Sequence, residues 1–267
     1  MTTLASFGYG LAAMCVSGTL LWLVSLAKRN VSIVDSLWSL MFLIGAIVYA
    51  AGAPESAPRV TLVLALTALW AVRLSAYITW RNWGEGEDHR YQAMRANRPE
   101  TFPYRSLVTV FYLQAVLASL VALPLLAAIR GTAPLGLLDY AGIGLWVFGM
   151  YFEVVGDAQL ARFKADPANK GQVLDTGLWR YTRHPNYFGE FCLWWGFYLI
   201  AAGAGGWWSV PGPLLISVLL LKVSGVTLLE KDISERRPAY RDYIEKTNAF
   251  FPGPPRNPAA RTGELSQ

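Results

Sequence analysis

The sequence has few of the residues that form disulfides and metal sites. It contains two cysteines and two histidines among 267 residues. Cys15 and Cys192 both fall in apolar stretches, and His89 and His184 do not form an HExxH-type pair. We therefore predict no structural or catalytic metal, and we interpret both cysteines as small buried residues.

Charge is scarce as well, which argues against a soluble domain. Charged residues make up 15% of the sequence and apolar residues 54%, a composition typical of a polytopic membrane protein. About 20 apolar residues cross a bilayer as a helix, the form that satisfies its own backbone hydrogen bonds there. We predict an all-α protein with seven transmembrane helices. They lie at Leu4–Ala27, Ile33–Ala51, Val60–Trp80, Leu107–Ile129, Leu138–Ala161, Tyr187–Ala204 and Pro211–Glu230.

Basic residues are concentrated in every second predicted loop. The loops after the first, third and fifth helices and the segment after the seventh carry nearly all of them, whereas the alternate loops contain only Arg59 and Arg130. By the positive-inside rule, the N-terminus lies outside and the C-terminus in the cytoplasm. The net charge of +5 then reflects topology and an anionic ligand, not nucleic acid. We expect an integral multi-pass protein of a bacterial inner membrane or an endoplasmic reticulum type membrane.

Polar side chains interrupt the apolar helices, where a charge is costly unless it binds something. Asp35 lies near the start of the second helix and shares a helix face with Trp38 and Phe42. We therefore predict that Asp35 is a catalytic acid and that the two aromatic residues bind the substrate. The alternative is a structural role for Asp35, in which the positive end of the helix dipole stabilises a carboxylate in the first turn. On the third helix, intervals of four place three polar residues on one face. These are Arg73, Tyr77 and Arg81.

The fifth helix combines small residues with carboxylates. Gly142, Gly149 and Gly156 repeat every seven residues, a pattern that predicts close helix packing. Glu153 and Asp157 lie four apart beside these glycines, where like charges repel unless a cation, ligand or shared proton bridges them. Because successive helices alternate in direction, the buried polar residues gather in the cytoplasmic half of the bilayer. We predict a polar cavity that opens to the cytoplasm and accommodates a lipid and a water-soluble cofactor.

The segment between residues 81 and 104 alternates acids and bases and offers no long apolar face. By default it is a solvated cytoplasmic loop. Its aromatic residues among arginines would also suit a lid over a nucleotide. The candidates for that role are Arg81, Glu87, Asp88, Arg90 and Tyr91.

The stretch Leu174–Trp195 leads a cationic segment directly into an apolar helix. Within it, Leu178–Glu190 (LWRYTRHPNYFGE) resembles the C-terminal signature of the steroid 5α-reductase family. Upstream residues from Gly149 and the closing segment Thr247–Pro252 are similar to that family too, so the strongest resemblance covers residues 149–252. The RHPxYxGE core also resembles sterol reductases and isoprenylcysteine carboxyl methyltransferases.

The resemblance implies a seven-helix bundle in which NADPH enters from the cytoplasm and reduces a 3-oxo-Δ4 steroid. In that family a glutamate on the second helix and a tyrosine on the third bind the steroid ketone. By position these correspond to Asp35 and Tyr77, with Tyr91 as the second choice for the tyrosine. Aspartate in place of glutamate is a departure from the family pattern that shortens the reach of the acid.

Cofactor binding is expected mainly from residues around the sixth helix, whose start we expect Asn186 to cap. Basic side chains there suit the phosphates of NADPH, and free backbone N–H groups at the start of the helix can bind the same phosphates. The resemblance implies carboxylates and tyrosines as further cofactor contacts. The predicted cofactor-binding residues are Arg73, Arg81, Glu153, Asp157, Lys164, Lys170, Arg180, Arg183, His184, Asn186, Tyr187, Glu190, Tyr240 and Tyr243.

We therefore expect an NADPH-dependent oxidoreductase that acts on the C4–C5 double bond of a steroid or a similar lipid enone, working as a monomer. Two alternatives remain: a membrane methyltransferase that uses S-adenosylmethionine, and a lipid-binding protein without enzymatic activity. The cations near the sixth helix favour a polyphosphate over a sulfonium amino acid. Residues 1–252 are expected to form one transmembrane domain, and residues 253–267 a disordered tail.

Overall fold

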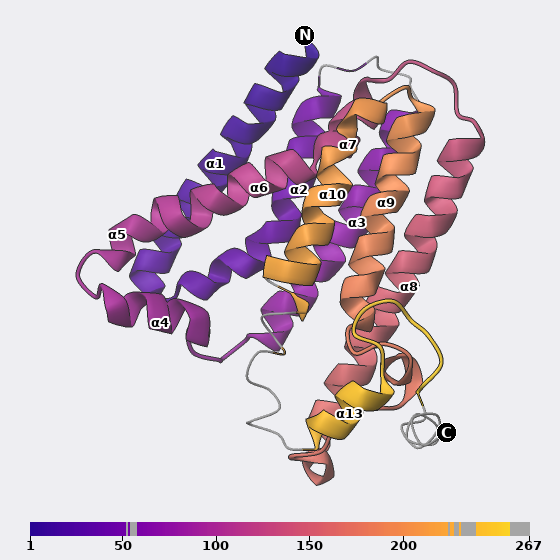
Figure 1. The fold of residues 1–267 in the computed structure, drawn as a ribbon. Helices are drawn as coiled ribbons and strands as arrows, with labels where there is room; N and C mark the ends of the chain where they lie inside the picture. Colours follow the sequence, from indigo (N-terminus) through magenta and orange to yellow (C-terminus); the bar gives the residue numbers. More distant parts are fainter. Residues whose placement is uncertain (52, 54–57, 224, 227–229, 231–238, 257–267) are drawn as a thin grey trace, which may run out of the picture. The chain divides into compact units, whose positions relative to one another are not determined.

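The computed structural model describes residues 1–51, 53, 58–223, 225–226, 230 and 239–256. Within these ranges the chain is helical and contains no strand (Figure 1). Among the described residues, five helices are long and apolar enough to cross a membrane. The protein is therefore an all-α, multi-pass membrane protein, as the apolar runs predict. The five spans are Thr3–Lys28, Val31–Ala50, Pro58–Arg81, Phe102–Val121 and Leu137–Ala165.

The helices follow the predicted apolar runs with small shifts at their ends. The sixth predicted run forms α9. The first part of the seventh lies in a shorter apolar helix, Trp207–Val223. Shorter helices and single turns make up the rest of the described chain. In chain order the elements are α1 (Thr3–Lys28), η1 (Val31–Ile33), α2 (Val34–Ala50), α3 (Pro58–Arg81), α4 (His89–Asn97), α5 (Phe102–Ser106), η2 (Leu107–Tyr112), α6 (Leu113–Val121), α7 (Leu123–Arg130), α8 (Leu137–Ala165), η3 (Pro167–Asn169), η4 (Gly177–Arg180), α9 (Pro185–Gly203), η5 (Trp207–Ser209), α10 (Pro211–Val218), η6 (Leu219–Val223) and α13 (Tyr240–Lys246).

The fourth predicted span is not one regular helix. It begins earlier than expected, at Phe102, and passes through the π-helical segment η2 before α6. At Ala122 the backbone leaves the helical region with ψ at 0°, and α7 follows with Pro124 in its first turn. Proline has no N–H to donate to the preceding turn, which explains the break at this point.

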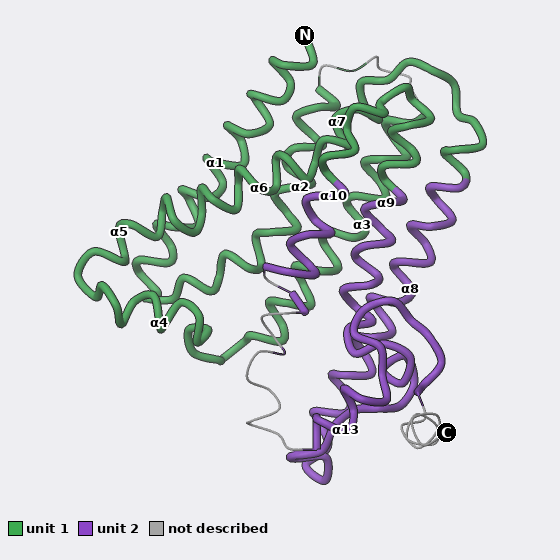
Figure 2. Tube along the Cα trace, viewed as in Figure 1, with its two compact units in different colours: residues 1–140, 197–212 green, residues 141–196, 213–267 purple. Residues whose placement is uncertain are grey.

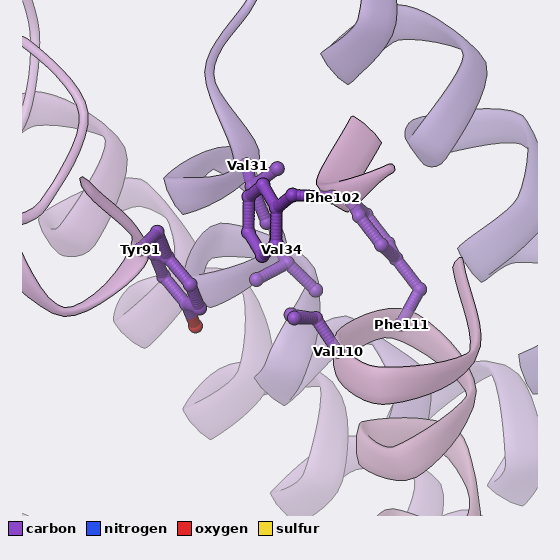
Figure 3. Packing of buried hydrophobic residues seen from close by; sticks show 6 residues of the cluster. All are labelled: Val31, Val34, Tyr91, Phe102, Val110 and Phe111. Atoms are coloured by element: carbon purple, nitrogen blue, oxygen red, sulfur yellow. The ribbon is translucent and has the colours of Figure 1, made fainter. Parts of the chain in front are cut away.

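Helix α4 replaces the solvated loop expected between residues 81 and 104. Asp88 caps it by accepting a hydrogen bond from the backbone N–H of Arg90, at 2.9 Å. Tyr91 is buried with Phe102 in a cluster that Figure 3 shows, packed against residues of η1, α2 and η2. Two buried aromatic residues therefore anchor a segment that is otherwise polar. The cluster consists of Val31, Val34, Tyr91, Phe102, Val110 and Phe111.

The chain divides into two compact units (Figure 2). Unit 1 comprises Met1–Tyr140 and Phe197–Gly212, and in it α2 packs between α1 and α3. Unit 2 comprises Ala141–Gly196 and Pro213–Gln267. The predicted tail lies outside the described residues from position 257 onward.

In unit 2 the glycines of α8 permit close contact with α9, as their spacing predicts. A Cβ atom on Gly149 would lie 2.5 Å from the carbonyl oxygen of Gly189, and one on Gly156 would lie 3.1 Å from the ring of Pro185. A Cβ atom on Gly196 would lie 2.7 Å from the carbonyl oxygen of Gly142. The expected glycine contact surface is confirmed, because larger side chains would push the two backbones apart.

Candidate functional site

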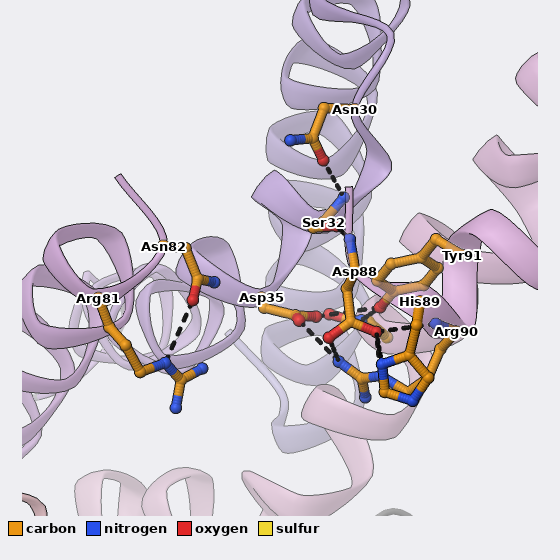
Figure 4. Close-up of polar contacts among 10 residues, drawn as sticks. Asn30, Ser32, Asp35, Arg81, Asn82, Asp88, His89, Arg90 and Tyr91 are labelled. Carbon is orange, nitrogen blue, oxygen red and sulfur yellow. Dashed lines mark hydrogen bonds and ion pairs between the residues drawn. The ribbon is translucent and has the colours of Figure 1, made fainter. Parts of the chain in front are cut away.

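Asp35 lies in the first turn of α2 and binds two residues of α4 (Figure 4). The hydroxyl of Tyr91 donates to Oδ1 of Asp35 at 3.0 Å, and Nη2 of Arg90 donates to Oδ2 at 3.0 Å. Nε2 of Gln114, on α6, lies 3.5 Å from the Tyr91 hydroxyl. Of the predicted site residues, the structure thus brings together Asp35, Arg90 and Tyr91.

A network of backbone and side-chain hydrogen bonds fixes α4 beside the start of α2. Asp88 accepts from Nε of Arg90 at 2.8 Å, and its own N–H donates to Oγ of Ser32 at 2.6 Å. Glu87 accepts from the N–H of Val31 at 2.8 Å and from two nitrogens of Arg95 at 2.8 Å each. Because both carboxylates are paired with arginines, we assign Glu87 and Asp88 a structural role in holding α4 in place.

Electrostatics keep the Tyr91 phenol protonated. Burial raises its pKa, and the neighbouring Asp35 carboxylate raises it further. A phenol that does not ionise near neutral pH remains a hydrogen-bond donor. Tyr91 therefore presents a permanent donor beside an acid at one end of α2.

Tyr77 has a different environment. Its ring lies 5.3 Å from the guanidinium of Arg73 and 5.9 Å from that of Arg81, distances suited to cation–π contact. The three residues therefore do share one face of α3, as their spacing predicts. Nε of Arg81 also donates to Oδ1 of Asn82, at 3.2 Å.

The two aromatics predicted to bind substrate lie on α2 in unit 1. The rings of Trp38 and Phe42 meet edge to face, with centroids 5.1 Å apart. Phe42 is fully buried and packs against Trp70 at 5.5 Å. Trp38 is half-buried, so that of the two it has the more accessible surface.

The residues predicted to bind the cofactor lie in unit 2, apart from Arg73 and Arg81. Arg183 and His184 are buried and bind Glu230. Nε and Nη2 of Arg183 donate to the two carboxylate oxygens of Glu230 at 2.7 and 2.8 Å, and Nε2 of His184 lies 2.9 Å from Oε1. Nothing in the local spacing of the sequence identifies Glu230 as the partner of Arg183, because the two residues are 47 positions apart.

Arg183 also holds the segment that follows α13. Its Nη1 donates to the carbonyl of Thr247 at 2.5 Å, and its backbone N–H donates to the carbonyl of Asn248 at 2.9 Å. Oγ1 of Thr182 donates to the carbonyl of Phe250 at 2.7 Å. The Tyr243 hydroxyl donates to the carbonyl of Trp179 at 2.5 Å. The signature Leu178–Glu190 and the closing segment are thus one structural assembly within unit 2.

Asn186 lies in the first turn of α9, which begins at Pro185, so the expected N-cap role is wrong. Its Oδ1 accepts from the N–H of Tyr187 at 3.0 Å, and its Nδ2 donates to Oδ1 of Asp157 at 3.1 Å. Asp157 and Glu153 are both buried in α8. The rings of Tyr187 and His184 stack with centroids 5.7 Å apart.

The remaining cofactor candidates differ in exposure. Lys164, at the end of α8, Lys170, in the connection that follows, and Arg180, in the signature, are exposed. Glu190 is half-buried in α9. Tyr240 is buried, with its ring 5.2 Å from that of Tyr243. The exposed cations are the candidates whose charge faces solvent.

Comparisons with known proteins identify a family for this chain but name no activity for it. Residues 21–247 match the family model DUF1295, which is described as a protein of unknown function. The chain is 29% identical over 277 residues to the uncharacterized protein C594.04c of Schizosaccharomyces pombe, an alignment that covers 92% of this chain and 79% of the fungal protein. No solved structure matches the chain significantly. Since the family match covers most of its length, the chain belongs to the DUF1295 family.

Proposed function

We propose that this protein reduces the C4–C5 double bond of a 3-oxo-Δ4 steroid, or of a similar lipid enone, with NADPH as the reductant. The observation that carries the proposal is the hydrogen bond between the buried Tyr91 and Asp35 at one end of a membrane-spanning helix. Reduction of an enone develops negative charge on the ketone oxygen, and a preorganised donor at that oxygen stabilises the transition state. Tyr91 is such a donor.

In the proposed reaction, Tyr91 turns its hydroxyl from Asp35 to the ketone oxygen of the substrate. Asp35 holds the phenol in place beforehand, and Arg90 holds Asp35, so that both act by positioning the donor. Tyr77 is the second candidate for the donor, on the stripe with Arg73 and Arg81. Water supplies the proton for the α-carbon. Trp38, beside Phe42, offers an apolar surface to the rings of the substrate.

The chemistry of the donor set in unit 2 fits a dinucleotide phosphate. Lys164, Lys170 and Arg180 are exposed cations, which suit phosphate oxygens. Asn186 and Asp157 are buried or half-buried polar groups that suit a ribose or a carboxamide. NADPH, when bound, supplies the hydride.

Arg183, His184 and Tyr243 have a different part in the proposal. Their polar atoms bind Glu230 and the backbone, so we assign them to positioning the closing segment. The proposal also includes two features of topology: seven membrane-spanning helices, and a cofactor site that faces the cytoplasm. The concentration of basic residues in alternate loops supports this orientation.

The test is a turnover assay on the full-length protein purified in detergent. NADPH and a 3-oxo-Δ4 steroid are added, and cofactor oxidation and product mass are followed together. We expect stoichiometric NADPH oxidation and a product heavier by two hydrogen atoms. Absence of turnover, together with tight binding of S-adenosylmethionine, would contradict the proposal and favour a methyltransferase. Absence of turnover with saturable steroid binding and no cofactor binding would favour a lipid-binding protein.

A further inference from the structure

An open cavity of about 850 Å³ lies in unit 1, next to the Asp35–Tyr91 pair but not lined by it. Its walls come from the end of α1, from η1, from the first turn of α2, from the end of α3 and from the segment that leads into α4. Figure 4 shows part of this wall, including Asn30, Ser32, Asn82 and His89. The full lining is Lys28, Asn30, Ser32, Ile33, Ser36, Thr79, Asn82, Trp83, Gly84, Glu85, Gly86, Glu87, Asp88, His89 and Gln92.

The location of the cavity points to the surface of the membrane. Helices α1, α2 and α3 are all long and apolar enough to cross a bilayer, and the cavity lies at the ends of α1 and α3 and at the start of α2. Ends of spanning helices lie at the level of the lipid headgroups. Apolar faces of α1 nearby are exposed, with Leu20 61% and Leu23 52% accessible, so acyl chains can lie against the helix below.

Two charged residues of the cavity lining have no ionic partner among the described residues. Lys28 and Glu85 are exposed, and neither forms an ion pair with another residue in the described part of the chain. Glu87 and Asp88 are already paired, with Arg95 and Arg90. One cation and one anion of the cavity wall are therefore available to a ligand that carries both charges.

Trp83 adds a surface suited to an ammonium group. Its side chain is 80% exposed, and it belongs to the cavity wall two residues from Glu85. Gly84 between them has φ of +81°, a left-handed conformation that glycine adopts without strain. An indole face and a carboxylate both attract an ammonium ion, also at an exposed site.

We propose that this cavity binds the headgroup of a zwitterionic phospholipid, with its ammonium at Glu85 and Trp83 and its phosphate at Lys28. The proposal concerns a site separate from the enone reduction and does not depend on it. The polyphosphate of a dinucleotide fits this cavity poorly, because Lys28 is the one lysine or arginine of the lining and Glu85 in the same wall adds an unpaired negative charge. An anionic lipid is disfavoured for the same reason.

The test measures lipid retention by the full-length protein. Protein purified in detergent is incubated with phosphatidylethanolamine or phosphatidylglycerol of identical acyl chains, and bound lipid is quantified by native mass spectrometry. We expect preferential retention of phosphatidylethanolamine. The Glu85→Gln and Lys28→Gln variants should each weaken it about fivefold, which corresponds to the loss of one exposed ion pair. Trp83→Ala should weaken it as well, whereas Trp83→Phe keeps an aromatic face and should retain most of the binding.

Matched variants away from the cavity serve as controls. Glu100→Gln and Lys246→Gln remove exposed charges of the same type and should leave retention unchanged. Equal retention of the two lipids, or full retention by Glu85→Gln, would overturn the proposal. Water-soluble phosphoethanolamine distinguishes the source of the headgroup: if it competes as well as the lipid at equal concentration, the ligand is a free phosphoamine and not a membrane lipid. Unchanged thermal unfolding of each variant shows that the fold is intact.

Discussion

Tyr91 and Asp35 are 56 positions apart in the sequence, yet the tyrosine hydroxyl donates to the aspartate carboxylate at 3.0 Å. The contact exists because α4 folds back onto η1 and the start of α2, where Glu87 and Asp88 bind Val31 and Ser32. Burial of Tyr91 in the cluster with Phe102 fixes its ring. A donor that is held by an acid and by packing is preorganised for a substrate oxygen.

The first prediction concerns this donor. Tyr91→Phe removes one hydroxyl and should lower steroid turnover about a hundredfold, as loss of one oxyanion donor does. Affinity for NADPH, measured by fluorescence titration, should be nearly unchanged. Tyr104→Phe, an exposed tyrosine on α5, is the matched control. If Tyr77→Phe reduces turnover more than Tyr91→Phe, the tyrosine of α3 is the donor; equal loss of turnover and NADPH affinity contradicts either role.

A second prediction tests the contact between α8 and α9. Gly149→Ala places a methyl group 2.5 Å from the carbonyl of Gly189 and 2.7 Å from the N–H of Leu193, and backbone atoms cannot move aside as a flexible side chain can. We expect a lower thermal unfolding midpoint in detergent. Gly144→Ala, on the same helix with no atom within 4 Å of the added carbon, should keep or raise the midpoint. Equal midpoints for the two variants would refute close packing at Gly149.

A third prediction concerns the buried ion pair between Arg59 and Asp139 in unit 1. Nε of Arg59 donates to Oδ1 at 2.7 Å and Nη2 to Oδ2 at 2.9 Å, and the carbonyls of Ala133 and Pro134 accept two further hydrogen bonds from the guanidinium. Arg59→Met leaves a buried carboxylate alone and should destabilise the protein by about 3–5 kcal/mol. The double variant Arg59→Met/Asp139→Leu should recover part of that loss. A double variant that loses the sum of both single effects would rule out direct coupling.

The fourth prediction addresses Arg183 and Glu230. Arg183→Lys keeps the charge but cannot reproduce the paired hydrogen bonds to the carboxylate, so the closing segment should open more often. Hydrogen exchange of the amides of Thr247–Phe251 should accelerate. Arg180→Lys, an exposed neighbour, is the control and should leave exchange unchanged. If Arg183→Lys abolishes NADPH binding without faster exchange, Arg183 contacts the phosphate directly.

The fifth prediction is a dependence of stability on pH. Burial raises the pKa of Glu87, but hydrogen bonds from Arg95 and from the N–H of Val31 outweigh it, so its pKa lies below the ordinary value. A depressed pKa in the folded state contributes stability above the ordinary value of about 4.3, and this stability is lost as the pH falls through the lower, folded value. The thermal midpoint of the wild type should therefore fall below about pH 4. Glu87→Gln should flatten that part of the curve, and Glu100→Gln should not.

The sequence by itself determined the class of the protein and its helices. In a bilayer, the backbone N–H and C=O groups of a long apolar run can form hydrogen bonds only within a helix. Five of the expected spans accordingly form described helices that can cross a membrane. Glycines spaced seven residues apart predicted the contact between α8 and α9, because a helix face without side chains allows a neighbouring backbone to approach closely. The resemblance at Leu178–Glu190 to the steroid 5α-reductase family remains a prediction, since the comparison shows the DUF1295 family.

Only the tertiary structure decided which polar groups meet. The helix α4 was missed because two buried aromatics, Tyr91 and Phe102, hold it, and a pair of anchors produces no periodic apolar pattern. The partners of Asp35 and Arg183 come from segments distant in the sequence, and ion pairs of this kind follow from how helices pack and not from local spacing. A single sequence lists the charged residues of a membrane protein, whereas the fold decides which of them meet.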